Sequence, residues 1–178
     1  IGIGHGAYWQ SLQDQRSGVN LLPATAGIDS PVRIGAAIQD FDAKQFVKPR
    51  KALKVMSREI QTGFSAAMLA SDHAKLEKGQ VVPDRIGVVY GSEMLFCEPD
   101  QVVDVYNPCI EDGEFHFDRW AKAFPAQMYP LWMLMYLPNM IACHVGIAHD
   151  ARGPNNTICQ GDASSLLALI EAAHIIQR

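Results

Sequence analysis

The residues best suited to chemistry lie near the end of the chain, in the stretch from Gly153 to Asp162. This stretch holds a thiol, Cys159, and a carboxylate, Asp162, with a glycine between them at Gly161. Gly161 permits a sharp bend that a Cβ would resist, and Asp162 is a good N-cap for the helix-forming run that follows. A helix N-terminus that points into a protein presents unpaired N–H groups and a partial positive charge, which suit a nucleophile or an oxyanion. The pattern therefore predicts a short strand, a tight corner and a helix, with a reactive group at the corner.

Both candidate groups also have a structural interpretation. A thiolate at Cys159 could be stabilised by the helix N-terminus, but the residue lies three positions before the predicted cap. A small buried hydrophobic residue is the preferred interpretation of Cys159. Asp162 could act as an anion at the helix N-terminus or could simply cap the helix, and both interpretations stay open. The run from Ala163 to Ile176 is apolar nearly all round, which predicts a helix buried on most sides.

The elements that must position this corner alternate between strand and helix signals. The run from Arg85 to Ser92 is the clearest strand, because it is continuously apolar as in a strand buried on both faces. Helices are expected over Arg58 to Ala74 and Met140 to Asp150, and an aromatic-rich surface excursion separates the strand from the second of them. The alternation predicts an α/β layered fold with a mixed or parallel sheet and buried helices.

Composition excludes several classes of protein. The chain has 178 residues, 48% of them hydrophobic, and a net charge of −4, which fits one globular domain with a substantial core. The absence of a basic patch interleaved with aromatic residues argues against nucleic-acid binding. Apolar runs stay short of the roughly 20 residues that a membrane-spanning helix needs. None of the four cysteines forms a Cys-x-x-Cys pair, so free thiols and a cytoplasmic protein are expected.

A metal site and a cofactor are not expected. His144 and His149 are five residues apart, whereas ligand pairs on a helix need a spacing of three or four. Both ends of the sequence look cut, because Ile1 begins without a capping residue and Arg178 follows directly on an apolar run. We therefore expect residues 1–178 to form a single domain that is half of a larger fold and is truncated at both ends.

Several short stretches match a known family in order and spacing. The stretches are Tyr8 to Leu12 with Arg16 to Val19, Ile38 to Asp42, Met56 to Gln61 with Ala66 and Ala67, Arg85 to Ser92, Leu137 to Ala142, and Gly153 to Asn155. Together they resemble the first half of the β-ketoacyl synthases, which belong to the thiolase-like condensing enzymes. The resemblance implies the N-terminal half of a thiolase-like layered fold, with the helix Ala163–Gln177 buried between layers.

The resemblance also implies a biochemical setting. Members of the family act in fatty-acid or polyketide synthesis and handle acyl thioesters on an acyl carrier protein. They dimerise, so a homodimer or a heterodimer with an active synthase is expected.

The family places its nucleophile at the strand-to-helix corner, in a Thr-x-x-x-Ala-Cys-Ser-Ser-Ser-Leu pattern. Aligned on this pattern, Thr157 matches the threonine and Gly161 the alanine, so the nucleophile position is Asp162. Cys159 falls three positions early and is the fallback nucleophile. A carboxylate is a poor nucleophile toward a thioester, and the resemblance therefore implies acyl transfer and condensation that are impaired.

Two further residues are expected at the acyl pocket, Met94 and Gln160. Many members have a glycine-rich loop where this chain has the bulky residues Glu93 to Phe96, which implies a narrowed pocket. Two alternatives to an impaired synthase follow from the family's known variants. One is a non-catalytic partner subunit of the chain-length-factor type, and the other is a malonyl decarboxylase.

Overall fold

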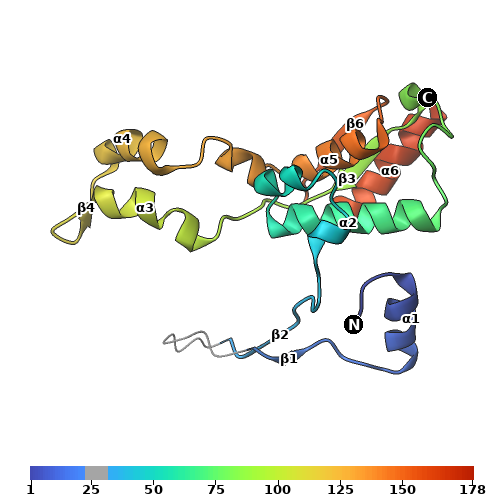
Figure 1. Cartoon of the computed structure of the whole chain (residues 1–178), viewed down its shortest axis with the longest axis horizontal. Coiled ribbons are helices and arrows are strands. Elements are labelled where there is room, and N and C mark those ends of the chain that lie inside the picture. Colours follow the sequence, from blue (N-terminus) through green and yellow to red (C-terminus); the bar gives the residue numbers. More distant parts are fainter. Residues whose placement is uncertain (23–31) are drawn as a thin grey trace. The chain divides into compact units, whose positions relative to one another are not determined.

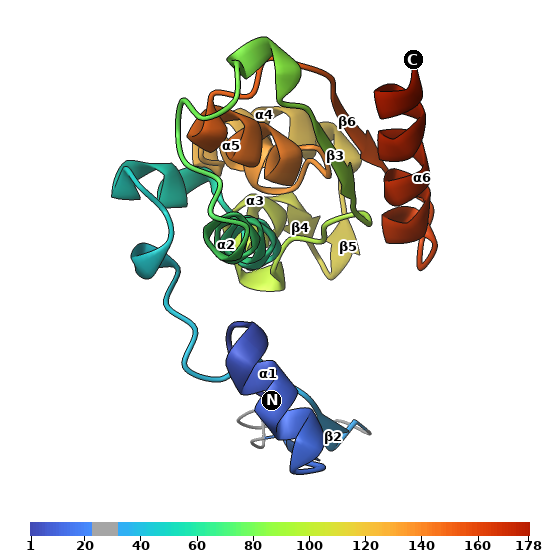
Figure 2. The same cartoon turned by 90° about the vertical axis from the view of Figure 1, so that its right-hand side faces the viewer.

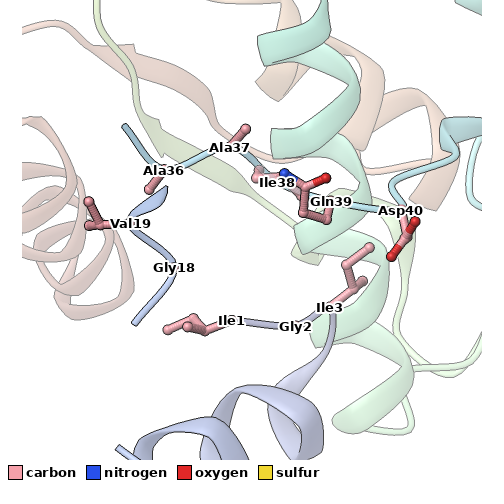
Figure 3. A pocket seen from close by; sticks show the side chains of 10 residues that line it. All are labelled: Ile1, Gly2, Ile3, Gly18, Val19, Ala36, Ala37, Ile38, Gln39 and Asp40. Carbon is pink, nitrogen blue, oxygen red and sulfur yellow. The ribbon is translucent and has the colours of Figure 1, made fainter. Parts of the chain in front are cut away.

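The computed structural model describes residues 1–22 and 32–178, and the chain divides into two compact units, Ile1–Gln45 and Phe46–Arg178 (Figure 1). The N-terminal unit contains helix α1 (His5–Gln13), an antiparallel pair of short strands, β1 (Asn20–Leu21) and β2 (Ile34–Gly35), and the 3-10 turn η1 (Ala43–Gln45). This unit contains a hollow of 610 Å³. Figure 3 shows its lining residues, Ile1–Ile3, Gly18, Val19 and residues 36–40. The lining is mainly aliphatic side chains and backbone, which offers little chemistry.

The larger unit is built around two parallel strands, β3 (Val88–Gly91) and β6 (Asn155–Ile158), paired from Val88↔Asn155 to Gly91↔Ile158. Helix α5 (Met140–His149) packs on one side of the pair and α6 (Ser164–Gln177) on the other, as Figure 2 shows. Helix α2 (Arg58–His73) packs against α5 and completes a second layer. The helices predicted over Arg58 to Ala74 and Met140 to Asp150 are thereby confirmed within one residue.

Helix α2 forms as its sequence predicts. Ser57 caps its N-terminus by accepting a hydrogen bond from the Ile60 N–H at 3.4 Å. Ile60 and Phe64, one helical turn apart, are buried at 0% and 3% exposure, and the helix packs on α5. Two polar contacts tie the layers together: the Tyr90 hydroxyl donates to the Gly63 carbonyl at 2.7 Å, and Ser71 Oγ lies 3.0 Å from His149 Nε2.

The predicted surface excursion is confirmed between β3 and α5. It consists of short elements: η4 (Pro99–Gln101), α3 (Val103–Tyr106), η5 (Asn107–Cys109), β4 (Ile110–Glu111), β5 (Glu114–Phe115), α4 (Phe117–Gln127) and η6 (Trp132–Met135). A chain of ring contacts runs through them, from Tyr106 and Phe115 to Trp132 and Tyr136, with centroid distances from 4.9 to 6.4 Å. Two further 3-10 segments, η2 (Arg50–Val55) and η3 (Pro83–Arg85), precede α2 and β3.

The burial predicted for the last helix is not observed. Only Ser164 and Ala168 of α6 are buried, whereas Leu166, Leu169 and Ile176 are 66%, 68% and 85% exposed. The reason is geometric, because the elements that α6 contacts most are β3 and β6, which lie on one side of the helix. Among the described residues, no helix combines the length and apolar character needed to cross a membrane.

Candidate functional site

The parallel pair brings two loops to the same edge of the sheet. Gly91 and Ile158 are the last paired residues, and the ladder ends where the Ser92 N–H donates to the Ile158 carbonyl at 3.0 Å. Beyond this point the chain enters a loop after β3, residues 92–98, and a corner after β6, residues 159–163. Open α/β sheets bind ligands just outside the carboxyl ends of their strands, so this edge is the place for a site.

The corner is closed by its own hydrogen bonds. Gly161 has a φ of +52°, which a glycine adopts without strain. The Ala163 N–H donates to the Gln160 carbonyl at 3.2 Å, and the Ser164 N–H donates to the Gly161 carbonyl at 3.1 Å. The Ser164 hydroxyl adds two more bonds, accepting from the Gln160 N–H at 2.8 Å and donating to the Gly161 carbonyl at 2.7 Å. Ser164 is only 4% exposed.

The start of α6 lies directly on β3. A Cβ built at Gly91 would come within 2.4 Å of the Ser165 nitrogen and 2.5 Å of the Ser164 carbonyl carbon. Only a glycine permits this approach of backbone to backbone. The sequence therefore fixes the N-terminus of α6 against the end of β3 through one residue without a side chain.

Asp162 does not cap the helix, and that prediction is wrong. The N-cap is Ala163, and no side chain makes a cap hydrogen bond. The Ser164 hydroxyl bonds the Gln160 N–H and the Gly161 carbonyl, which precede the helix, so it does not take over the cap. Asp162 is exposed, and within residues 1–22 and 32–178 its carboxylate has no hydrogen-bond or ion-pair partner.

Cys159 is exposed rather than buried, so the interpretation as a small buried hydrophobic residue is wrong. The residue comes directly after the last residue of β6, where the chain leaves the sheet and turns toward solvent. Gln160 is exposed beside it. The corner thus presents a thiol, an amide and a carboxylate on one short exposed loop.

The loop after β3 meets the corner through Glu93. Glu93 Oε2 lies 3.5 Å from the position of a Cβ built at Gly161, while Oε1 accepts the N–H of Met94 at 2.8 Å. The Met94 side chain is 64% exposed, so it does not pack into the corner. Farther along the loop, Phe96 contributes to a hollow of 220 Å³ that also involves Met56 and Tyr136.

Two polar groups on α5 and β6 are buried without hydrogen-bond partners among the described residues. Burial lowers the pKa of His144 on α5 below its usual value. His144 Nε2 and Thr157 Oγ1 both lack hydrogen-bond partners among the described residues. The Asn155 side chain donates to the Ala142 carbonyl at 3.2 Å and ties β6 to α5.

In residues 1–22 and 32–178, no group of three or more His, Cys, Asp and Glu side chains could hold a metal ion.

The sequence analysis missed the roles of two residues that shape this corner, Gly91 and Ser164. Gly91 carried a signal, because a glycine at the end of an apolar strand often marks a close backbone approach. Ser164 also carried one, since serine is as good a partner for backbone groups at a helix start as aspartate. Glu93 was expected near the acyl pocket as part of the bulky loop Glu93 to Phe96, but its approach to Gly161 depends on tertiary structure.

Comparison with known proteins identifies a family that matches this chain. Residues 1–178 match the protein-family model described as the N-terminal domain of β-ketoacyl synthase. A 3-oxoacyl-(acyl-carrier-protein) synthase 2 from Synechocystis sp. is 28% identical over 173 residues, which are 96% of this chain and 38% of that protein.

Two solved structures share the fold. The ishigamide ketosynthase/chain length factor superposes with a TM-score of 0.66 at 22% identity, covering 99% of this chain and 45% of the other. A β-ketoacyl synthase from Burkholderia phymatum gives a TM-score of 0.67 at 22% identity, covering 97% of this chain and 39% of the other. These likenesses confirm the thiolase-like α/β fold class.

The chain spans 38% of the length of the Synechocystis relative. The family match, by contrast, extends over all 178 residues of the chain. The chain therefore belongs to the β-ketoacyl synthase N-terminal domain family.

Proposed function

We propose that this chain is a β-ketoacyl synthase homologue of fatty-acid or polyketide synthesis in which Asp162 takes the place of the nucleophile and condensation is impaired. One observation carries the proposal: Asp162 lies at the corner between β6 and α6, at the end of two parallel strands, with an exposed carboxylate and no partner among the described residues. Because the Synechocystis relative is named for an acyl carrier protein, the proposed partner is a carrier protein bearing an acyl thioester.

The chemistry of the two candidate groups differs. A thiolate attacks a thioester carbonyl, expels the carrier thiol and keeps the acyl group as a new thioester of similar energy. The carboxylate of Asp162 is a weaker nucleophile, and its product would be an anhydride that water hydrolyses. Cys159 is the fallback nucleophile, since its thiol is exposed three residues earlier in the chain. Gln160 and Met94 are proposed to lie beside the bound acyl group.

A partner subunit of the chain-length-factor type is the second candidate. It is favoured by the same corner, in which a carboxylate rather than a thiol precedes α6. In this case the chain would pair with an active synthase and would shape a pocket without reacting itself. The oligomer would then be a heterodimer, whereas an impaired synthase would form a homodimer.

A malonyl decarboxylase is disfavoured by charge. Glu93 and Asp162 both belong to the two loops that meet at the corner, and neither carboxylate forms an ion pair within the described residues. A malonyl group carries its own carboxylate, which these two charges would repel.

The localisation and the domain organisation are proposed as follows. The free thiols of all four cysteines support a cytoplasmic protein. Residues 1–178 are proposed to be one domain of the synthase type.

The test is acylation by a radiolabelled acyl group on a carrier protein, with peptide mass spectrometry to find the modified residue. We expect wild type to take no stable label, Asp162→Cys to take label at residue 162, and Cys159→Ala to behave as wild type. Label at Cys159 in wild type would overturn the proposed impairment. An unlabelled Asp162→Cys variant would overturn the assignment of residue 162 to the nucleophile position.

A further inference from the structure

The corner that holds Asp162 depends on a residue with no part in the proposed chemistry. The first N–H groups of a helix need partners, and serine, threonine, aspartate or asparagine usually supplies one from the N-cap. In this chain the hydroxyl of Ser164, the first residue of α6, reaches backward to the Gln160 N–H at 2.8 Å. It also donates to the Gly161 carbonyl at 2.7 Å, so one buried hydroxyl closes the loop on both sides.

The backbone of Ser164 is itself held in place by β3. The backbone of Ser164 and Ser165 rests against Gly91, where a Cβ would come within 2.4 to 2.5 Å of it. At 4% exposure, the Ser164 hydroxyl cannot be replaced by bulk water without a rearrangement. Removing it would take away the hydrogen-bond partner of the Gln160 N–H and one of the donors to the Gly161 carbonyl.

From this geometry we propose that Ser164 is a positioning residue that fixes the corner from Gln160 to Asp162 and leaves the Asp162 carboxylate without a structural task. The inference rests on the proposed function of this corner, but it concerns how the corner is held and adds no ligand site. The helix start does not need the carboxylate of Asp162, which is left exposed to solvent.

The first test uses a thiol as a reporter at residue 162. In a Cys159→Ala background, the Asp162→Cys variant is alkylated with iodoacetamide over a range of pH, and mass spectrometry gives the rate at residue 162 alone. Adding Ser164→Ala should raise the pH midpoint of that reaction by roughly half a unit and slow it about threefold near neutral pH, because the corner that holds residue 162 just before α6 loses two hydrogen bonds. Adding Ser165→Ala is the matched control, since Ser165 is exposed on the next position of the same helix.

An unchanged pH profile with Ser164→Ala, or an equal shift with Ser165→Ala, would overturn the inference. A purely structural role would lower the melting temperature without moving this profile. Because no acyl substrate is used, the result is independent of whether the proposed function holds.

A second measurement needs no variant. In wild-type protein the amide hydrogen of Gln160 should exchange at least tenfold more slowly than the amide of an unstructured peptide, because its acceptor is a buried hydroxyl. Exchange at the unstructured rate would show that the bond is absent and would overturn the inference.

A third measurement uses the Asp162→Ala variant. Its melting temperature should equal that of wild type, whereas a fall of several degrees would show that Asp162 caps the helix after all.

Discussion

At the scale of single residues, burial changes the acid–base behaviour of His144. Its pKa is lowered from the usual 6.5, because the charged ring loses hydration on α5. The folded chain therefore keeps His144 neutral at pH values where the unfolded chain binds a proton. The stability that depends on neutral His144 is complete above about pH 6.5 and is lost progressively as the pH falls toward the lower folded pKa.

We expect the free energy of unfolding of wild type, measured in urea, to be smaller near pH 5.5 than near pH 7.5. His144→Gln should reduce this difference, because glutamine does not titrate. His174→Gln, which removes an exposed histidine from α6, is the control and should keep the wild-type difference. The assignment fails if His144→Gln retains the full dependence on pH.

Gly91 is the residue whose replacement should be most damaging at the corner. Its Cβ would meet backbone atoms of Ser164 and Ser165, which cannot move aside as a flexible side chain can. We expect Gly91→Ala to reduce the free energy of unfolding by about 2–4 kcal/mol. Gly6→Ala is the control, because a Cβ there meets nothing within 4 Å and alanine favours the helix. Equal stability of the two variants in urea titrations would contradict the close approach.

At the scale of elements, local patterns predicted what local physics determines. The spacing of Ile60 and Phe64 predicted α2, and the apolar run from Arg85 to Ser92 predicted β3, although the strand itself is shorter, Val88–Gly91. These predictions succeed because helix period and strand propensity act over a few residues.

The corner and the last helix show where such reasoning ends. Asp162 was a good N-cap by residue type, yet the helix begins one residue later at an Ala163 N-cap, while the Ser164 hydroxyl bonds the Gln160 N–H. The exposure of Cys159 depends on where β6 ends. The burial of α6 depends on whether another element covers its outer face, and no property of the helix sequence itself contains that information.

The aromatic chain of the excursion makes a prediction at the same scale. Phe115 contacts Tyr106 at 4.9 Å and Trp120 at 6.2 Å, so it joins α3 to α4. We expect Phe115→Ala to loosen the excursion alone, seen as faster proteolysis within residues 99–137 and unchanged hydrogen exchange in α2. Phe117→Ala is the milder comparison, because that ring is 74% exposed and contacts only Phe115 among the ring pairs of the described residues, at 6.4 Å. Equal proteolysis of the two variants would contradict a structural role for the ring chain.

At the scale of the whole molecule, one face of α6 exposes several large apolar side chains. Leu166, Leu169, Ile170 and Ile176 recur at helical spacing on one side of α6 and are 52% to 85% exposed. Near the end of the helix, Ile176 also lines a hollow of 760 Å³ together with Val89 and Ile175. Contiguous apolar surface of this kind marks an interaction surface or a site of self-association.

We expect the 178-residue chain to bind the dye ANS and to self-associate through this face. The double variant Leu166→Glu, Ile176→Lys should lower both dye fluorescence and light scattering severalfold without unfolding the chain, because an acid in the first turn and a base in the last turn favour the helix dipole. Ile147→Lys is the control, since Ile147 is 78% exposed on α5, away from this face. If the control lowered association as much as the double variant, the effect would not be specific to the α6 face. If neither variant changed it, the α6 face would not be the contact surface.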